Sequence, residues 1–319
     1  MNQRKIKVLY IAGPSRSGST ILSNILGEID GFFNAGELID IWDRGVAANG
    51  SCGCGAPMKD CEIWGMVLNQ AFGSPAQIDI HEMIHRRDRA AHSSYVPWRM
   101  WIPGARQRFA DRHALYLNTL KKLYHAIQSV IGCNVIIDSS KNVGYADILT
   151  MIPAIDLHIV HLIRDSRATA YSWRRKKEGL WRENPVKTSL VWNVRNIISG
   201  MLGMNSPRKY LRLFYEDFVR DPQEAILQIL DLLREKESSS CLPFVSKYEV
   251  KLGGNHSVFG NPNRFQKGIF KLQTDDEWMN GTMKNLDKVI VTMLTWPLLM
   301  KYGYFDFSPM FVWIERGST

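Results

Sequence analysis

The chain has 319 residues, of which 45% are hydrophobic and 22% charged, and its formal net charge is +9. This composition is ordinary for a soluble globular protein, and the absence of repeats and biased segments excludes a repeat array or a low-complexity chain. The excess of 40 lysines and arginines over 31 acidic residues favours an anionic ligand, a nucleic acid or an acidic membrane surface as partner. We expect a single compact domain over residues 1–319, because α/β folds often reach this length.

The apolar stretches of the chain do not predict export or membrane insertion. The run Val8–Ala12 is too short for the core of a signal peptide. The late stretch Val289–Met300 is interrupted by Pro297 and is shorter than the roughly 20 residues that a bilayer requires. The five cysteines do not make an even disulfide framework. We therefore expect a soluble, cytoplasmic protein with no membrane span, while the sequence does not indicate an oligomeric state.

The first predicted elements alternate between strand and helix. Residues 5–12 are almost continuously apolar and strand-favouring, which predicts a buried strand. A loop over residues 13–18 follows, and apolar residues at helical spacing then predict a helix over residues 19–29. We expect a short loop at residues 34–37 before an apolar segment at residues 38–42.

Residues 43–110 lack a regular apolar pattern and are interpreted as a mostly helical insertion or lid that covers one side of the ligand site. Glycine and proline are frequent early in this segment, and charges and tryptophans are frequent late. The aromatic and basic residues singled out here are Trp64, Trp98, Trp101, Arg86, Arg87, Arg89, Arg99, Arg106 and Arg108. They suit a ring-bearing or anionic small molecule, and equally a packed helical lid.

The remainder of the chain returns to alternating elements. Apolar runs predict strands at residues 134–137, 156–163 and 210–215. Helical periodicity predicts helices at residues 114–131, 166–177 and 222–233. This alternation indicates an α/β fold with a parallel β-sheet flanked by helices. Ligands of such folds bind at the carboxyl ends of the strands, where all the motifs below fall.

The segment Gly13–Thr20 has the frame of a P-loop, Gly-x4-Gly, between the first strand and its helix. Backbone N–H groups of such a turn and the helix N-terminus bind phosphate or sulfate. An ATP-binding loop has lysine where this chain has Ser19, and the only cation of the loop is Arg16. A nucleotide kinase or NTPase needs that lysine and a Mg²⁺ site, so this alternative is disfavoured.

A second candidate anion site follows the strand at residues 156–163. Arg164 stands at the end of that strand, and Ser172 lies early in the following helix, so both can face one anion. Two such sites at strand ends suit a ligand with phosphates at two ends. The alternatives are a plain basic helix start, or a nucleic-acid-binding module that uses Arg174–Lys177 with Trp173 and Trp181.

These motifs resemble those of the sulfotransferases that use 3′-phosphoadenosine-5′-phosphosulfate (PAPS), which have a P-loop-like fold. The loop residues similar to the family's 5′-phosphosulfate loop are Pro14, Ser15, Arg16, Ser17, Gly18, Ser19 and Thr20. They match the version with arginine where cytosolic members carry lysine. The stretch 164–172 is similar to the 3′-phosphate motif, and Arg164 and Ser172 match its binding pair.

Two later segments extend the resemblance, which runs from residue 6 to about residue 280. Residues 214–218 resemble the Tyr-Glu-Asp segment, whose tyrosine, here Tyr215, lies near the nucleotide. Residues 256–268 resemble the C-terminal loop that closes over the 3′-phosphate. The resemblance implies binding roles there for Asn261, Arg264, Lys267 and Gly268. Cytosolic members have Arg-Lys-Gly where this chain has Gln-Lys-Gly, so Arg264 is expected to supply the missing charge.

The resemblance implies transfer of a sulfuryl group from PAPS to a hydroxyl or amine of a small-molecule acceptor, a metabolite or lipid. The other product is 3′,5′-adenosine bisphosphate. A sulfuryl group carries less charge than a terminal phosphoryl group, so we expect metal-independent transfer. Its main requirement is a cation where charge develops on the leaving phosphate, and Arg16 is placed for this role. We expect neither nucleic acid nor a metal as a partner.

Transfer also needs a group that accepts the acceptor's proton. Family members with arginine in the loop carry the base in a Gly-Glu after the first helix, which implies Glu37; a surface loop glutamate is the alternative. The histidine base of cytosolic members has no counterpart in the stretch Asp138–Lys141. Lys141 is a candidate for stabilising the sulfuryl group or the nucleotide, or is a plain loop lysine.

Three of the five cysteines, Cys52, Cys54 and Cys61, cluster in a glycine-rich stretch. A zinc site usually has four ligands with paired spacing, and no fourth ligand is evident nearby in the sequence. The cluster therefore stays open between a metal site, a disulfide and small buried thiols.

Overall fold

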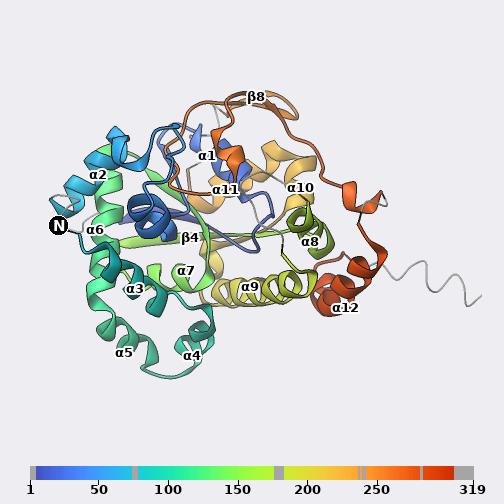
Figure 1. Ribbon diagram of the computed structural model, residues 1–319, viewed down its shortest axis with the longest axis horizontal. Coiled ribbons are helices and arrows are strands. Elements are labelled where there is room, and N and C mark those ends of the chain that lie inside the picture. Colours follow the sequence, from blue (N-terminus) through green and yellow to red (C-terminus); the bar gives the residue numbers. More distant parts are fainter. Residues whose placement is uncertain are drawn as a thin grey trace, which may run out of the picture. The chain divides into compact units, whose positions relative to one another are not determined.

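The computed structural model describes residues 5–73, 78–175, 183–235, 238, 242–280 and 283–304. The chain divides into two compact units, residues 1–163 with 195–274 and residues 164–194 with 275–319. Figure 1 shows the ribbon coloured along the sequence, with its helices and strands labelled. The expectation of a single domain stays a prediction. Lys176, Lys177 and Trp181 of the basic run discussed above lie outside the described residues.

The first unit contains a five-stranded parallel sheet, which confirms the predicted fold class. The strand order is β2 (Phe32–Gly36), β3 (Val135–Lys141), β1 (Ile6–Ala12), β4 (Ile155–Ile163) and β5 (Tyr210–Phe214). The chain leaves β1 toward one edge of the sheet and, after β3, continues on the other side of β1. This reversal of direction puts the loop after β1 at the position where α/β folds bind ligands.

One strand of the parallel sheet was not expected. Residues 34–37 were predicted as a loop, but Phe32–Gly36 pairs with β3 as an edge strand. The segment is short and contains asparagine and glycine, so its strand signal is weak, and its pairing with β3 decides its conformation. The second predicted strand, expected to end at Ile137, continues to Lys141.

The sheet separates two hydrophobic cores by the two-residue alternation of its strands. Along β1, Val8 and Tyr10 face one core, and Leu9 and Ile11 face the other. The first core also contains apolar residues of the insertion, of α6 (Ala114–Ile131) and of α7 (Val143–Leu149), and the second contains those of α1 (Ser19–Gly27) and α11 (Pro222–Leu233). The strands are therefore covered on both faces, which explains their nearly continuous apolar sequences.

The remaining elements of the first unit surround this frame. Its other helices are α2 (Glu62–Phe72), α3 (Ile80–Ala90), α4 (Val96–Trp101), α5 (Ala105–Arg112) and α10 (Tyr215–Arg220). A small antiparallel sheet contains β6 (Phe244–Ser246), β7 (Glu249–Leu252) and β8 (Gly268–Lys271). The described part of residues 43–110 is mainly helical, in line with the expected helical insertion.

The second unit contains α8 (Ser166–Arg174), α12 (Asn285–Lys301) and the first part of α9 (Pro185–Asn205), which continues into the first unit. Its small core includes Ala168, Trp278 and Val291, and the hydroxyl groups of Ser166 and Thr295 lie 2.8 Å apart. Among the described residues, no helix combines the length and the apolar character that crossing a bilayer would require.

A buried ion pair joins the insertion to the frame of the first unit. Nε of Arg99 in α4 donates to Oδ2 of Asp147 in α7 at 2.5 Å, and both side chains are almost fully buried. Arg106 in α5 donates to the other carboxylate oxygen at 2.9 Å, but its side chain is 39% exposed. Because solvent screens the outer contact of Arg106 with Asp147, the inner pair of Arg99 and Asp147 contributes most of the stability of this connection.

We predict that Asp147→Ala destabilises the protein by about 3–5 kcal/mol, because it leaves Arg99 as an uncompensated buried charge. Arg106→Ala serves as the matched control and should cost less than about 1 kcal/mol. The measurement is urea unfolding of the three proteins followed by circular dichroism. Equal losses in the two variants would contradict the different roles of the inner and outer contacts.

Candidate active site

The loop after β1 turns directly into the N-terminus of α1. Gly18 precedes the helix in a left-handed conformation with φ 88°, and its carbonyl accepts the Leu22 N–H at 3.1 Å. The Ser17 hydroxyl is buried and has no hydrogen-bond partner among the described residues. A buried hydroxyl of this kind is available to an anion bound in the loop, because burial without a partner is otherwise costly. The loop thus fits the predicted phosphate-binding function.

Two candidate cations have a strained backbone. Arg16 has φ 72° and Lys141 has φ 61°, in the left-handed region that residues with a side chain rarely adopt. Such conformations cost on the order of 1–3 kcal/mol each and concentrate at functional sites. Lys141 lies beside the start of the loop that contains Arg16, because Lys141 at the end of β3 pairs with Ala12 at the end of β1.

A third cation, Arg195 of α9, contacts the same loop. Its Nη1 donates to Oγ of Ser15 at 2.6 Å. Burial lowers the pKa of Arg195, while Glu37 and Tyr10 nearby favour its charged form. Sequence reasoning did not identify this residue. The available signal was a single arginine within an apolar helix, but the helix itself was not predicted.

Glu37 and Lys141 form an ion pair at the carboxyl ends of β2 and β3. Nζ of Lys141 donates to Oε1 of Glu37 at 2.5 Å and to the carbonyl of Ser139 at 2.9 Å. The exposed fractions of the two side chains are 16% for Glu37 and 7% for Lys141, so a partly dry environment strengthens their attraction. The structure therefore brings together two of the three residues expected to act in transfer.

Backbone hydrogen bonds hold the turn that carries Glu37. Its N–H donates to the carbonyl of Phe259 at 3.4 Å, and the Ile39 N–H donates to Oγ of Ser140 at 3.1 Å. The Ser140 hydroxyl in turn donates to Asp138, which is fully buried and also accepts the Tyr124 hydroxyl at 2.5 Å. This network fixes the backbone of the turn that carries Glu37.

Gly260 lies between Glu37 and the start of α1. A Cβ atom at Gly260 would lie 3.4 Å from Oε1 of Glu37 and 3.9 Å from Oγ1 of Thr20. The carboxylate therefore lies close to the last residue of the phosphate loop. Because Gly260 has φ 145°, only glycine adopts this backbone without strain.

Asp40 lies one turn after Glu37, and its N–H donates to the Glu37 carbonyl at 3.0 Å. Burial, together with the negative charges of Glu37 and Asp43, raises the pKa of Asp40 from 3.8 to about 7. A carboxyl group with such a pKa exchanges protons near neutral pH. The sequence analysis did not single out Asp40, because its pKa depends on burial that the sequence pattern does not reveal.

The tyrosine of the Tyr-Glu-Asp segment contacts the phosphate loop. A Cβ atom at Gly18 would lie 2.6 Å from Cδ2 of Tyr215, so the ring packs directly on the loop backbone. Any larger residue at position 18 would displace the ring. This contact agrees with the expected location of Tyr215, which begins α10 and does not end the preceding strand as we expected.

The segment Asn261–Gly268 lies against α1, where the Asn263 carbonyl accepts Nδ2 of Asn24 at 3.4 Å. Asn261 caps a short helical turn through the Asn263 N–H, Lys267 is exposed, and Gly268 begins β8. Arg264 is buried, and its guanidinium donates to the carbonyls of Ser257 at 3.1 Å and Ser51 at 2.7 Å. The charge of Arg264 is thus directed at loop carbonyls.

The two residues of the expected 3′-phosphate pair belong to the second unit. Nη2 of Arg164 donates to the backbone carbonyl of Asp275 at 3.0 Å and lies 3.0 Å from its Oδ2. Arg175 lies 2.6 Å from the same carboxylate, and the two arginines lower the pKa of Asp275. Ser172 is buried in α8.

The insertion contains a cavity of about 580 Å³. Its lining includes the basic residues Arg86, Arg89, Arg99, Arg108 and Arg112 and the aromatic residues Tyr95, Trp98 and Phe109. Five of the residues that the sequence analysis singled out thus face one cavity. Its basic and aromatic lining suits a planar or anionic ligand.

The fold and the loop after β1 define a sulfotransferase-type α/β protein. Residues 9–237 match the model of the sulfotransferase family, and the chain therefore belongs to this family. The resemblance seen in the sequence is confirmed. The comparisons give no support to the kinase or NTPase alternative.

A solved structure agrees with this fold. The chain is similar to the sulfotransferase domain of the olefin synthase from Synechococcus PCC 7002, with 19% identity, a TM-score of 0.52 and coverage of 96% of this chain and 98% of that one. It also matches the sulfotransferase domain from the curacin biosynthetic pathway, with 18% identity, a TM-score of 0.49 and coverage of 92% and 99%. At 19% identity the likeness to the olefin synthase domain shows the fold alone. A comparison with curated proteins found no match.

The raised pKa of Asp40 predicts a specific pH dependence of stability. The folded state binds this proton more tightly than the unfolded state, so the stabilising contribution is complete below pH about 4 and is lost as the pH rises through about 7. Asp40→Asn removes the titration. Between pH 5 and pH 8 the variant should lose less unfolding free energy than the wild type, by on the order of 2–4 kcal/mol. Urea unfolding at the two pH values measures this difference, and parallel losses would refute the assignment.

Proposed function

We propose that the protein transfers a sulfuryl group from PAPS to a hydroxyl or amine of a small-molecule acceptor, without a metal in the reaction. The observation that carries this proposal is the Glu37–Lys141 ion pair, with Nζ 2.5 Å from Oε1, beside a phosphate-type loop that contains Arg16. A carboxylate, a cation and an anion-binding loop at one edge of a parallel sheet are the groups that sulfuryl transfer requires.

In the proposed reaction, Glu37 accepts the proton of the acceptor as its oxygen or nitrogen attacks sulfur. The bond from sulfur to the bridging oxygen of PAPS breaks, and the charge that develops there is stabilised by Arg16 and the loop N–H groups. Lys141 orients the Glu37 carboxylate, and its ammonium group is also available to the sulfuryl oxygens. Arg195 supports the loop through its 2.6 Å contact with Ser15.

For nucleotide binding, the proposal rests on both the motifs and local contacts. Tyr215, packed on Gly18, is proposed to lie beside the nucleotide. Arg164 and Ser172 are proposed ligands of the 3′-phosphate on the strength of their motif. Among the C-terminal residues, Asn261, Lys267 and Gly268 keep their proposed binding roles. Arg264 is proposed to hold this loop in place, since its guanidinium already donates to two backbone carbonyls.

We further propose that the acceptor is an anionic or aromatic small molecule bound against the insertion. Five arginines and three aromatic residues line the cavity found there, with Glu82 as its acidic member. Such a lining attracts carboxylates, sulfates or phosphates and stacks on planar rings. A screen with labelled donor identifies the acceptor within this class.

Arg16→Ala should lower kcat by about 100-fold, because one contact to the leaving oxygen is lost. Arg16→Lys keeps a charge and should retain more activity. Both variants bear the same left-handed backbone strain, so the difference between them reports the charge. Turnover is measured with labelled PAPS and no added Mg²⁺. An Ala variant as active as the wild type would remove Arg16 from the chemistry, and a strict need for Mg²⁺ would favour a phosphoryl-transfer enzyme.

Glu37→Gln should abolish transfer while the nucleotide still binds, because the amide cannot accept the acceptor's proton. Binding is measured as the thermal shift produced by 3′,5′-adenosine bisphosphate, with ATP and AMP as comparison ligands. Asp40→Asn is the parallel variant, since it changes the neighbouring carboxyl group. Loss of transfer in Asp40→Asn with normal activity in Glu37→Gln would make Asp40 the base.

A further inference from the structure

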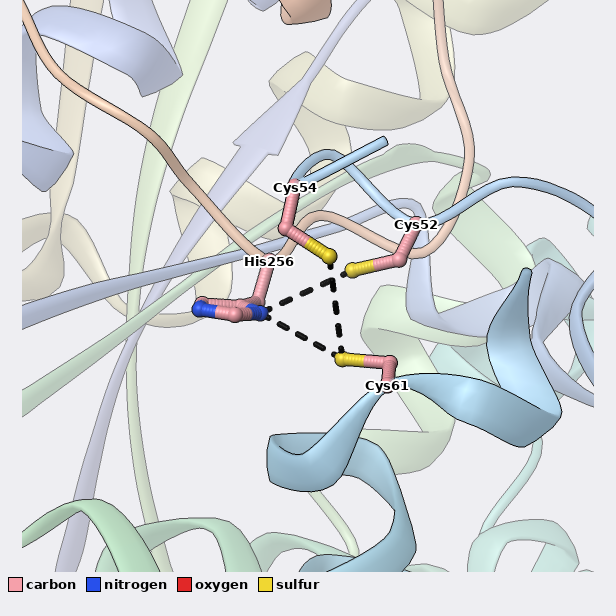
Figure 2. A group of neighbouring side chains, drawn as sticks. All are labelled: Cys52, Cys54, Cys61 and His256. Carbon is pink, nitrogen blue, oxygen red and sulfur yellow. Dashed lines mark hydrogen bonds between the residues drawn. The ribbon is translucent and has the colours of Figure 1, made fainter. Parts of the chain in front are cut away.

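Four potential metal ligands converge outside the candidate active site. They are Cys52 and Cys54 on a glycine-rich loop, Cys61 at the start of α2, and His256 on the segment that leads to Gly260 (Figure 2). Their ligand atoms all lie within 4.8 Å of one another. The three sulfur atoms and Nδ1 of His256 point toward a common centre in Figure 2. His256 lies 195 residues after Cys61, which is why no fourth ligand is evident in the sequence.

The distances match a tetrahedral zinc site. Zinc–sulfur bonds of about 2.3 Å and zinc–nitrogen bonds of about 2.0–2.1 Å place ligand sulfurs roughly 3.8 Å apart and sulfur and nitrogen roughly 3.5 Å apart. The sulfurs of Cys54 and Cys61 are 4.0 Å apart. Nδ1 of His256 lies 3.7 Å from the sulfur of Cys52 and 3.4 Å from that of Cys61.

The same distances disfavour the disulfide alternative. A disulfide requires two sulfurs about 2.05 Å apart, and all three cysteines are free thiols in the structure. Small buried thiols would explain the cysteines alone, but not a histidine nitrogen directed at two of them. A set of three cysteines and one histidine is a usual ligand set for structural zinc.

Hydrogen bonds between the cysteine segment and the histidine segment hold the four ligands close together. The Gly53 N–H donates to the Ser257 carbonyl at 2.9 Å, and Nε1 of Trp64 donates to the His256 carbonyl at 2.6 Å. A Cβ atom at Gly53 would lie 2.0 Å from Oδ1 of Asn255, so only glycine allows this approach. These contacts fix both the cysteine loop and the histidine segment, as is typical of the shell around a metal site.

We propose that Cys52, Cys54, Cys61 and His256 bind one structural Zn²⁺ ion. Four protein ligands complete the tetrahedron and leave no position for a substrate, so the ion has no part in sulfuryl transfer. Three thiol protons leave to solvent as the thiolates bind the metal. The ion would tie the cysteine loop to the segment from His256 to Gly260, which contacts the Glu37 backbone through Phe259.

The test measures the metal content and the stability of the full chain under reducing conditions. It needs no assay of sulfuryl transfer, so its outcome is independent of the proposed function. Mass spectrometry of the metal should find about one zinc per chain. Cys61→Ser should lose this zinc, and Cys133→Ser is the matched control, because Cys133 is also buried and free but lies outside the cluster. The control should keep about one zinc.

If Cys61→Ser does not fold, removal of zinc from the wild-type protein tests the proposal instead. A strong chelator should release one equivalent of zinc and lower the melting temperature, and added zinc should restore it. Absence of stoichiometric zinc after loading would overturn the proposal. So would iron in place of zinc, equal zinc in Cys61→Ser and the wild type, or a disulfide between Cys54 and Cys61 in peptides from protein purified without reductant.

Discussion

The ion pair between Glu37 and Lys141 joins the carboxyl ends of two neighbouring strands, and the candidate site depends on it. Parallel pairing brings Gly36 level with Asp138 and Ala12 level with Lys141, so the chain delivers a carboxylate, an ammonium group and the phosphate loop to one edge. Partly buried charges of opposite sign stabilise each other only while both are present, because removing either leaves the other poorly solvated. The attraction between Glu37 and Lys141 therefore stabilises this end of the sheet in addition to the hydrogen bonds between its strands.

Much of the fold could be predicted because its elements bear strong local signals. The helices at residues 114–131 and 222–233 were predicted with the bounds that the structure has, since their apolar faces repeat at helical spacing. The central strands were evident from continuous apolar runs. β2 was missed because its five residues gain their conformation from pairing with β3. α9 was missed because its apolar residues do not form one clear face.

The residues of the candidate site also divide into those that the sequence revealed and those that only the structure revealed. Residues adjacent in sequence, such as those of the loop around Arg16 and of the Gly-Glu turn, were recognisable as motifs. Contacts across long separations were not: Arg195 meets Ser15 from 180 residues away, and His256 meets Cys61 from 195 residues away. A sequence pattern records which residues could bind an anion or a metal, but only the packing of distant segments determines which of them meet.

The left-handed backbone at Arg16 and Lys141 has a consequence for engineering this protein. Glycine in place of Arg16 would relieve conformational strain, since glycine adopts a positive φ at little cost, whereas glycine in place of Lys141 would also leave the Glu37 carboxylate without its partner. A library selected only for heat resistance would therefore enrich glycine at position 16, where the side chain carries the charge. Rational stabilisation should hold these two positions constant and seek its gains in the helices on either side of the sheet.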